Sequence, residues 1–152
     1  MVQNQEVAIT AIAKIPSKAV GTLKQFDCGD KFLNEFARKQ LIKNDKKNLH
    51  KGFVAIADEK VVGYVTTKVS SLVRSFLGQP GLPNSVPVLS LEQIATDVRY
   101  QRCKIGSRLL NEVLQVTIKV SQVTGVYGLQ LWAHPSALNF YNTLGFSALS
   151  QK

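Results

Sequence analysis

The sequence predicts a single α+β domain, and three of its stretches support this prediction. Residues 53–67 are rich in β-branched and aromatic side chains on both sides of the turn Asp58-Glu59-Lys60, which is typical of a β-hairpin. Residues 88–96 form another strand-like run that leads into a basic loop. Residues 105–120 carry apolar side chains at helical spacing. A hairpin together with a strand-to-helix unit indicates the α+β class.

Length and composition favour one globular domain over residues 1–152. The chain has 45% hydrophobic and 19% charged residues, which is ordinary for a folded protein. A chain of this length buries about two-thirds of the surface that it exposes when unfolded. Its formal net charge of +9 indicates an anionic partner, which is a nucleic acid, a phosphorylated cofactor, or both.

The cysteines and the hydropathy pattern limit the class of protein further. Cys28 and Cys103 lie far apart without metal-ligand spacing, so we expect free thiols and no metal site. No apolar run approaches the roughly 18 residues of a membrane span, and the N-terminus lacks the pattern of a signal peptide. We therefore expect a cytoplasmic protein that does not contact a membrane.

The first third of the chain is predicted to hold a weak strand over residues 7–13 and an amphipathic helix that begins near Asp30. The apolar stripe of this helix is Phe32, Leu33, Phe36, Ala37 and Leu41. The opposite side carries Lys31 and five further cations, which we name the basic face: Arg38, Lys39, Lys43, Lys46 and Lys47. We expect it to bind nucleic acid, and the alternative is a solvated face without a partner.

The last third is predicted to hold one strand and one short helix. Residues 77–87 contain glycine or proline at five positions and predict a loop. Residues 127–133 predict a strand whose Trp132 lies in the core. Ser136 is the expected cap of a helix over residues 137–144, and Gly145 is the expected end of that helix. From Phe146 onward there are residues for only one short strand.

The loop at residues 99–107, which we name the anion loop, carries the strongest functional signal. It joins a strand to a helix N-terminus, where unpaired N–H groups and the helix dipole favour an anion. Four cations surround the turn: Arg99, Arg102, Lys104 and Arg108. We expect a pyrophosphate to bind at Arg102, Cys103, Lys104, Ile105, Gly106 and Ser107.

Three motifs resemble the GCN5-related N-acetyltransferase (GNAT) family. They are Gln101-x-x-x-x-Gly106, the hairpin with Gly63-Tyr64, and Ala137-x-x-Phe140-Tyr141-x-x-x-Gly145-Phe146. The resemblance implies a mixed, mostly antiparallel sheet that splays at its centre, with helices on both faces and acetyl-coenzyme A bound at the splay. The family's last strand is expected to be missing from this chain.

The resemblance also implies which residues bind the cofactor. The backbone of Ile94, Ala95 and Thr96 is expected to bind the thioester oxygen and the pantetheine arm. Gln101 and Asn139 are expected to complete that site.

Tyr141 is the expected general acid, because a phenol pKa near 10 is close enough to that of a thiol for efficient proton transfer. Glu92 lies near the place where other GNAT enzymes hold a base that acts through water. Lys104 replaces the first glycine of the cofactor signature. If that position needs a left-handed backbone, the lysine costs about 1–2 kcal/mol.

A narrower resemblance involves Phe26-Asp27-Cys28-Gly29-x-x-x-Leu33-Asn34-x-Phe36, which is similar to the GNAT toxins of bacterial toxin–antitoxin modules. It implies acetylation of the amino group of aminoacyl-tRNA, a ribbon-helix-helix antitoxin as partner, and a homodimer.

Two alternatives remain open from the sequence. The first is a general amine acetyltransferase for small molecules or proteins that uses Glu92. The second is a non-catalytic GNAT domain that serves as a binding module.

Overall fold

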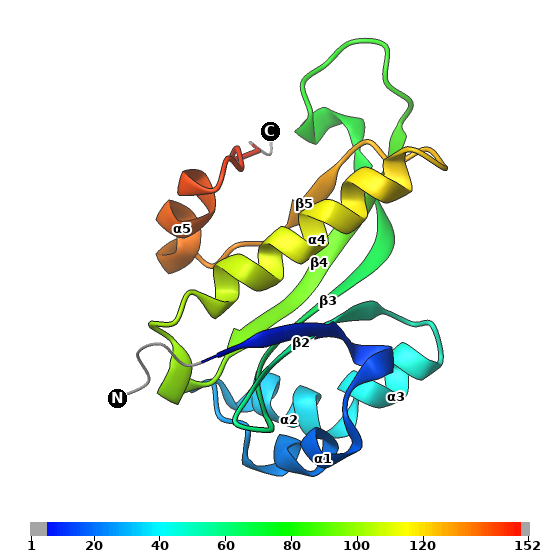
Figure 1. Ribbon diagram of the computed structural model, residues 1–152. Coiled ribbons are helices and arrows are strands. Elements are labelled where there is room, and N and C mark those ends of the chain that lie inside the picture. The colour runs from blue at the N-terminus through cyan, green and yellow to red at the C-terminus, as the bar shows by residue number, and fades with distance from the viewer. Residues whose placement is uncertain (1–5, 150–152) are drawn as a thin grey trace.

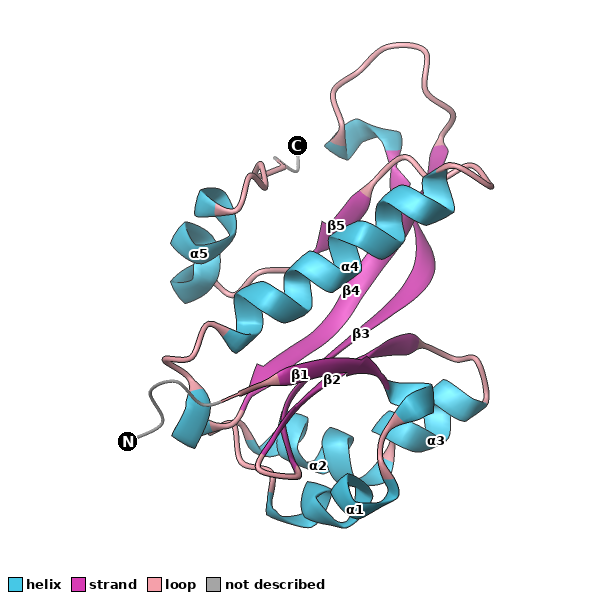
Figure 2. Ribbon diagram, viewed as in Figure 1, coloured by secondary structure: helices cyan, strands magenta, loops and turns pink. Residues whose placement is uncertain are grey.

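A computed structural model describes residues 6–149 as a five-stranded sheet with helices on both faces (Figures 1 and 2). The strands are β1 (Ala8–Ala11), β2 (Lys51–Ala57), β3 (Lys60–Val73), β4 (Ser85–Thr96) and β5 (Leu129–Leu131). The α-helices are α1 (Ser17–Val20), α2 (Lys31–Lys39), α3 (Leu41–Lys46), α4 (Ile105–Ser121) and α5 (Leu138–Thr143). The sheet order is β1-β2-β3-β4-β5; β1 to β4 are antiparallel and β5 is parallel to β4. The predicted mixed, mostly antiparallel sheet is confirmed.

The predicted hairpin is formed by β2 and β3, which are joined by a two-residue turn. Ala57 pairs with Lys60 across only Asp58 and Glu59, whose φ angles are 53° and 62°. Two left-handed residues match the right-handed twist of the flanking strands. The hairpin prediction is confirmed, and β3 extends further, to Val73.

Alternating side chains of the hairpin build a core on each face of the sheet. Val54 and Tyr64 pack with Phe36 on the side of α2 and α3. Ala55 and Val65 lie in a second core on the side of α4, which crosses the sheet in front of β3 and β4 in Figure 1. The helices carrying the basic face and the helix that follows the anion loop therefore cover opposite faces.

The predicted amphipathic helix begins as expected but is interrupted. The Asp30 carboxylate caps α2 by accepting from the Leu33 N–H at 3.0 Å. Gln40, with φ −125°, separates α2 from α3, so the expected stripe does not run along one helix. Phe36 and Leu41 are buried, whereas Phe32 is 67% exposed. The prediction that Phe32 belongs to the core stripe is wrong, because Leu33 and Phe36 pack into the core with Tyr64 of β3 while Phe32 faces solvent.

The splay of the sheet is visible where β5 leaves β4. The two strands pair only at residues 89–91 of β4, and β4 then continues to Thr96 paired with β3 but no longer with β5. β5 is shorter than the predicted strand 127–133, and Trp132 is 77% exposed rather than in the core. The described residues after Phe146 form no strand, so that expectation is also wrong.

The final helix ends as predicted and begins differently. Ser136 does not cap it; the His134 ring nitrogen accepts from the Ser136 N–H, and α5 starts only at Leu138. Gly145 has φ +95°, and the Phe146 N–H bonds back to the Tyr141 carbonyl at 3.1 Å. This closure is the expected glycine helix end. No helix within residues 6–149 is long and apolar enough to cross a membrane.

Candidate active site

The anion loop turns sharply into α4 at Lys104. This residue is the N-cap of α4 with φ 58° and ψ 27°, which is the left-handed region. The conditional prediction from the sequence is therefore confirmed: a side chain occupies a position that favours glycine, at a cost of about 1–2 kcal/mol. The Lys104 side chain does not cap the helix, so the first N–H groups of α4 stay available to a ligand.

Gly106 lies in the first turn of α4, close to two other elements. A Cβ atom at Gly106 would lie 3.7 Å from Phe140 and 4.0 Å from Thr96, so this glycine lies between the end of β4 and α5. The N–H groups of Ile105, Gly106 and Ser107 belong to the first helical turn and have no intrahelical acceptor. Their convergence there suits the pyrophosphate of a coenzyme A thioester.

Two of the four cations predicted to surround the turn bind other protein groups. Arg99 binds the Asp97 carboxylate through Nε at 2.9 Å and Nη2 at 2.8 Å. Arg108 donates to the Val7 carbonyl at 2.7 Å. Arg102 and Lys104 are exposed and, among the described residues, in no ion pair. The positive charge beside the first turn of α4 therefore comes mainly from these two.

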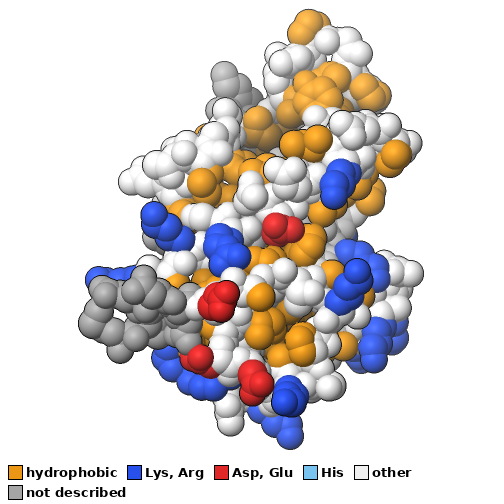
Figure 3. Space-filling model, viewed as in Figure 1, with side chains coloured by type: hydrophobic (Ala, Val, Ile, Leu, Met, Phe, Trp, Pro, Cys, Tyr) orange, Lys and Arg blue, Asp and Glu red, His pale blue; other side chains and the backbone are white. Residues whose placement is uncertain are grey.

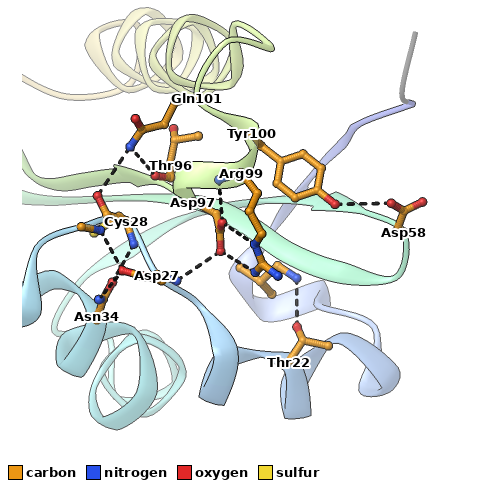
Figure 4. Close-up of polar contacts among 12 residues, drawn as sticks. Thr22, Asp27, Cys28, Asn34, Asp58, Thr96, Asp97, Arg99, Tyr100 and Gln101 are labelled. Carbon is orange, nitrogen blue, oxygen red and sulfur yellow. Dashed lines mark hydrogen bonds and ion pairs between the residues drawn. The ribbon is translucent and has the colours of Figure 1, made fainter. Parts of the chain in front are cut away.

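The side chain of Gln101 points away from the start of α4. Its amide donates to the Thr96 carbonyl at 3.2 Å and to the Cys28 carbonyl at 3.5 Å (Figure 4). Gln101 therefore links the end of β4 to the segment around Cys28. Cys28 and Cys103 are both half-buried.

The backbone of β4 presents alternate residues to the splay. The Asp97 N–H bonds to the Val62 carbonyl on β3, so Ala95, two residues earlier, also points toward β3. Ile94 and Thr96 point the other way, where β5 has already diverged. Of the three predicted backbone groups, the structure brings Ile94 and Thr96 to the splay and turns Ala95 away from it.

A β-bulge places Glu92 at the fork of the sheet. Thr66 pairs with Gln93 and Thr67 with Leu91, so Glu92 is an extra residue in β4. It comes directly after the last residue of β4 that pairs with β5. Sequence reasoning missed the bulge, because an inserted residue leaves no periodic signal of its own.

Two partners hold the Glu92 carboxylate. Lys68 forms an ion pair with Oε1 at 3.3 Å, and the Ser90 hydroxyl donates to Oε2 at 2.6 Å. Gln130 on β5 donates to the same hydroxyl at 2.6 Å. This network joins β3, β4 and β5 at the point where the sheet opens. The structure therefore gives Glu92 an ion-pair partner, as expected for a strand residue beside a cation.

Tyr141 lies on α5 and is 9% exposed. Its ring packs edge-on against Phe140 at 5.1 Å and Phe146 at 5.7 Å. Burial raises the pKa of its phenol, which keeps the hydroxyl protonated at neutral pH. The hydroxyl forms no hydrogen bond within residues 6–149, so it is available to a ligand. Asn139, on the same helix, is exposed.

All five residues of the basic face are exposed, and none is in an ion pair with another described residue. The single acid between residues 38 and 51, Asp45, is 2% exposed and is bound by Lys51 at 3.3 Å. Figure 3 shows the basic side chains gathered over α3. The charge of this surface is therefore not neutralised locally.

The sheet forks beside the first N–H groups of α4, which have no acceptor, and a protonated tyrosine lies on α5. This combination is that of an acyltransferase site for a coenzyme A thioester. Residues 48–148 match the model of the acetyltransferase (GNAT) domain. The chain therefore belongs to the GNAT family, whose members are acetyl-coenzyme A-dependent acetyltransferases.

Several known proteins are similar to this chain. A tRNA-acetylating toxin of Mycobacterium tuberculosis is 27% identical over 122 residues, which cover 76% of this chain and 72% of that protein. The crystal structure of a tyrosine-to-phenylalanine mutant of KacT has a TM-score of 0.87 at 25% identity, covering 97% of this chain and 91% of KacT. AtaT complexed with acetyl-methionyl-tRNA has a TM-score of 0.86 at 24% identity, covering 97% and 90%.

Proposed function

We propose that the protein transfers the acetyl group of acetyl-coenzyme A to the amino group of an amino acid carried by tRNA, and that it thereby blocks translation as a toxin. The observation that carries the proposal is the fork of the sheet, where β4 extends beyond its pairing with β5 and where Gly106 in the first turn of α4 lies near α5, the helix of Tyr141. The similarity to a tRNA-acetylating toxin and the unneutralised basic face support tRNA as the acceptor.

The cofactor is bound by the loop and by the free edge of β4. Arg102 and Lys104 attract the pyrophosphate, and the N–H groups of residues 105–107 donate to it. Ile94 and Thr96 offer their backbone groups to the thioester and the pantetheine arm. Acetyl-coenzyme A supplies an activated acetyl group and a thiolate as leaving group.

Tyr141 donates the proton that the leaving thiolate needs. Its raised pKa keeps the phenol protonated, and its free hydroxyl leaves room for a hydrogen bond to sulfur. The acceptor needs little help from a base, because an α-amino group has a pKa of about 7.7–8.0 and an ester lowers it further. A neutral amine is therefore present at physiological pH.

The partners follow from the same proposal. AtaT, a structural neighbour, has been solved with the C-terminus of the antitoxin AtaR, and we propose a ribbon-helix-helix antitoxin for this chain. We also propose a homodimer, one domain over residues 1–152, and the cytoplasm as the place of action, since charged tRNA is found there.

The test is acetylation of total aminoacyl-tRNA by the purified protein with labelled acetyl-coenzyme A. We expect N-acetyl-aminoacyl adenosine after ribonuclease digestion, measured by mass spectrometry. The matched control is Gly106→Glu, which puts a carboxylate where the pyrophosphate binds and abolishes the product. Absence of the product from the wild-type protein, when the cofactor is bound, rejects tRNA as acceptor.

A second candidate is acetylation of a small or protein amine with Glu92 as base. The bulge favours it, because it places the Glu92 carboxylate, paired with Lys68, at the fork. Under this candidate Glu92→Gln lowers the rate more than Tyr141→Phe does, and polyamines or lysine peptides are acetylated in place of tRNA. A wild-type protein that does not bind acetyl-coenzyme A at millimolar concentration leaves only the non-catalytic binding module.

A further inference from the structure

Asp97 is a fully buried acid directly after β4, and nothing in the proposed chemistry uses it. It is 0% exposed. Its Oδ1 accepts from the Arg99 N–H at 3.0 Å and from Arg99 Nε at 2.9 Å. Its Oδ2 accepts from Arg99 Nη2 at 2.8 Å and from the Asp27 N–H at 3.1 Å. The carboxylate thus holds the first residues of the anion loop and a segment seventy positions earlier in the chain.

The earlier segment is a rigid turn over Asp27-Cys28-Gly29. The Asp27 carboxylate accepts from the Gly29 N–H at 2.9 Å and from the Asn34 amide at 3.0 Å. Asn34, on α2, accepts in return from the Cys28 N–H at 2.8 Å. These reciprocal bonds fix the turn to the first helical turns of α2 (Figure 4).

Three further contacts fasten this turn to the anion loop. The Val98 N–H donates to the Asp27 carbonyl at 2.8 Å, and Gln101 bridges the Cys28 and Thr96 carbonyls. Gly29 has φ +89°, and its missing Cβ would lie 3.6 Å from the Val98 side chain. The turn is therefore in direct contact with residues 97–101, immediately before the residues that face the pyrophosphate.

We propose that Asp97 is a positioning residue for acetyl-coenzyme A, and that it acts by clamping the anion loop to the Asp27-Cys28-Gly29 turn. The inference rests on the proposed placement of the cofactor at this loop. Burial raises the pKa of Asp97, but the bonds from Arg99 and Asp27 outweigh burial and keep that pKa below its usual value. The acid is therefore ionised at neutral pH, and its charge holds the Arg99 guanidinium.

The clamp limits the freedom of the loop before the cofactor arrives. A loop that is already ordered does not pay the entropy of ordering on binding, and its N–H groups keep their direction. In Asp97→Asn one of the two acceptor oxygens becomes an NH2 group, so the side chain can no longer accept from both Arg99 and the Asp27 N–H as the carboxylate does. The loop then samples conformations in which its donors do not converge on one anion.

The test compares Asp97→Asn with Leu41→Val, a core change in α3 remote from the loop. Calorimetric titration of each variant with acetyl-coenzyme A gives the dissociation constant, and thermal unfolding gives the stability. We expect Asp97→Asn to raise the dissociation constant about ten- to hundred-fold, and Leu41→Val to leave it within two-fold. Hydrogen exchange of the amides at residues 98–104 should accelerate only in Asp97→Asn.

A second pair of variants keeps the inference testable if Asp97→Asn unfolds. Arg99→Gln breaks the clamp from its other side, and Asn34→Ala loosens the turn from α2. Each single variant should raise the dissociation constant of acetyl-coenzyme A. The double variant should raise it by less than the product of the two single fold-changes, because both substitutions disrupt the same clamp. If the losses of binding free energy in the two single variants add up in the double variant, the two residues do not act through one clamp.

The failure of this inference is distinct from that of the proposed function. If the wild-type protein binds acetyl-coenzyme A and Asp97→Asn binds it within two-fold as tightly, the clamp is structural and the inference is overturned. If the wild-type protein shows no binding, the proposed cofactor site itself is wrong. If it binds the cofactor but acetylates no tRNA, the acceptor is wrong and the inference stands.

Discussion

Lys104 is a residue under backbone strain at the start of α4, where a glycine is more stable. We expect Lys104→Gly to raise the free energy of unfolding by about 0.5–1 kcal/mol, because the relief of about 1–2 kcal/mol is partly offset by the entropy of glycine. Lys104→Ala is the matched control, since it removes the charge and keeps the Cβ atom. Chemical denaturation measures both variants, and equal stability of the two would show that the position is unstrained.

The same two variants distinguish the effect of backbone strain at Lys104 from the effect of its charge on cofactor affinity. If the Lys104 ammonium holds phosphate, both variants bind acetyl-coenzyme A more weakly than the wild-type protein, whatever their stability. If only Lys104→Gly changes the affinity, the backbone geometry of the turn decides binding.

Tyr141 is the residue whose removal should affect rate and binding differently. We expect Tyr141→Phe to lower the turnover rate about 10²–10⁴-fold while the dissociation constant of acetyl-coenzyme A stays within three-fold. Because burial raises the pKa of Tyr141, the acid form is retained as pH rises and is lost only at a higher pH than for a free phenol. Phe146→Leu is the control for packing, and an equal loss of binding and rate in Tyr141→Phe would assign Tyr141 to packing alone.

At the scale of elements, α2 and α3 are expected to contact tRNA through the basic face. The double variant Lys43→Glu/Lys46→Glu should weaken tRNA binding and flatten the dependence of log affinity on log salt, by just under about one unit of slope for each phosphate that the protein no longer neutralises. The control Lys14→Glu/Lys119→Glu changes the net charge equally at other exposed positions. Cofactor affinity should not change in either variant. Equal tRNA affinity of the two variants would remove the basic face from the mechanism.

Elements with a local signal were predicted well from the sequence. The hairpin followed from β-branched residues around a short turn, and α2 and α4 from their spacing and from the Asp30 cap. The bulge at Glu92 and the clamp at Asp97 were missed, since each depends on a partner that is distant in the sequence. Ser136 was misassigned because His134 supplied the ring nitrogen that accepts its N–H.

At the scale of the whole molecule, the outer edge of β5 is the open end of the sheet. A cavity of about 580 Å³ lies beside it, between α4, α5 and the described residues after Phe146. Trp132 is exposed next to it, and its ring lies edge-on to that of Phe76 with the ring centroids 6.3 Å apart. Exposed apolar side chains also surround the upper part of the molecule in Figure 3. Such an edge favours pairing with another chain.

We therefore expect a homodimer at tens of micromolar. Size-exclusion chromatography with light scattering measures the mass, and hydrogen exchange at residues 129–131 reports whether the edge is covered. A strictly monomeric protein whose β5 amides exchange slowly would contradict the dimer, because the chain would then close its own sheet.

The parallel pairing of β4 with β5 has a consequence for the order in which the protein folds. β1 to β4 pair as antiparallel neighbours, whereas β5 reaches β4 only after α4 has crossed the sheet. Contacts between distant parts of a chain form slowly, because loop closure must precede them. On the ribosome, the anion loop is complete well before α5 and Tyr141 are synthesised. We therefore expect the proposed cofactor site at residues 99–107 to be synthesised before the proposed proton donor, Tyr141.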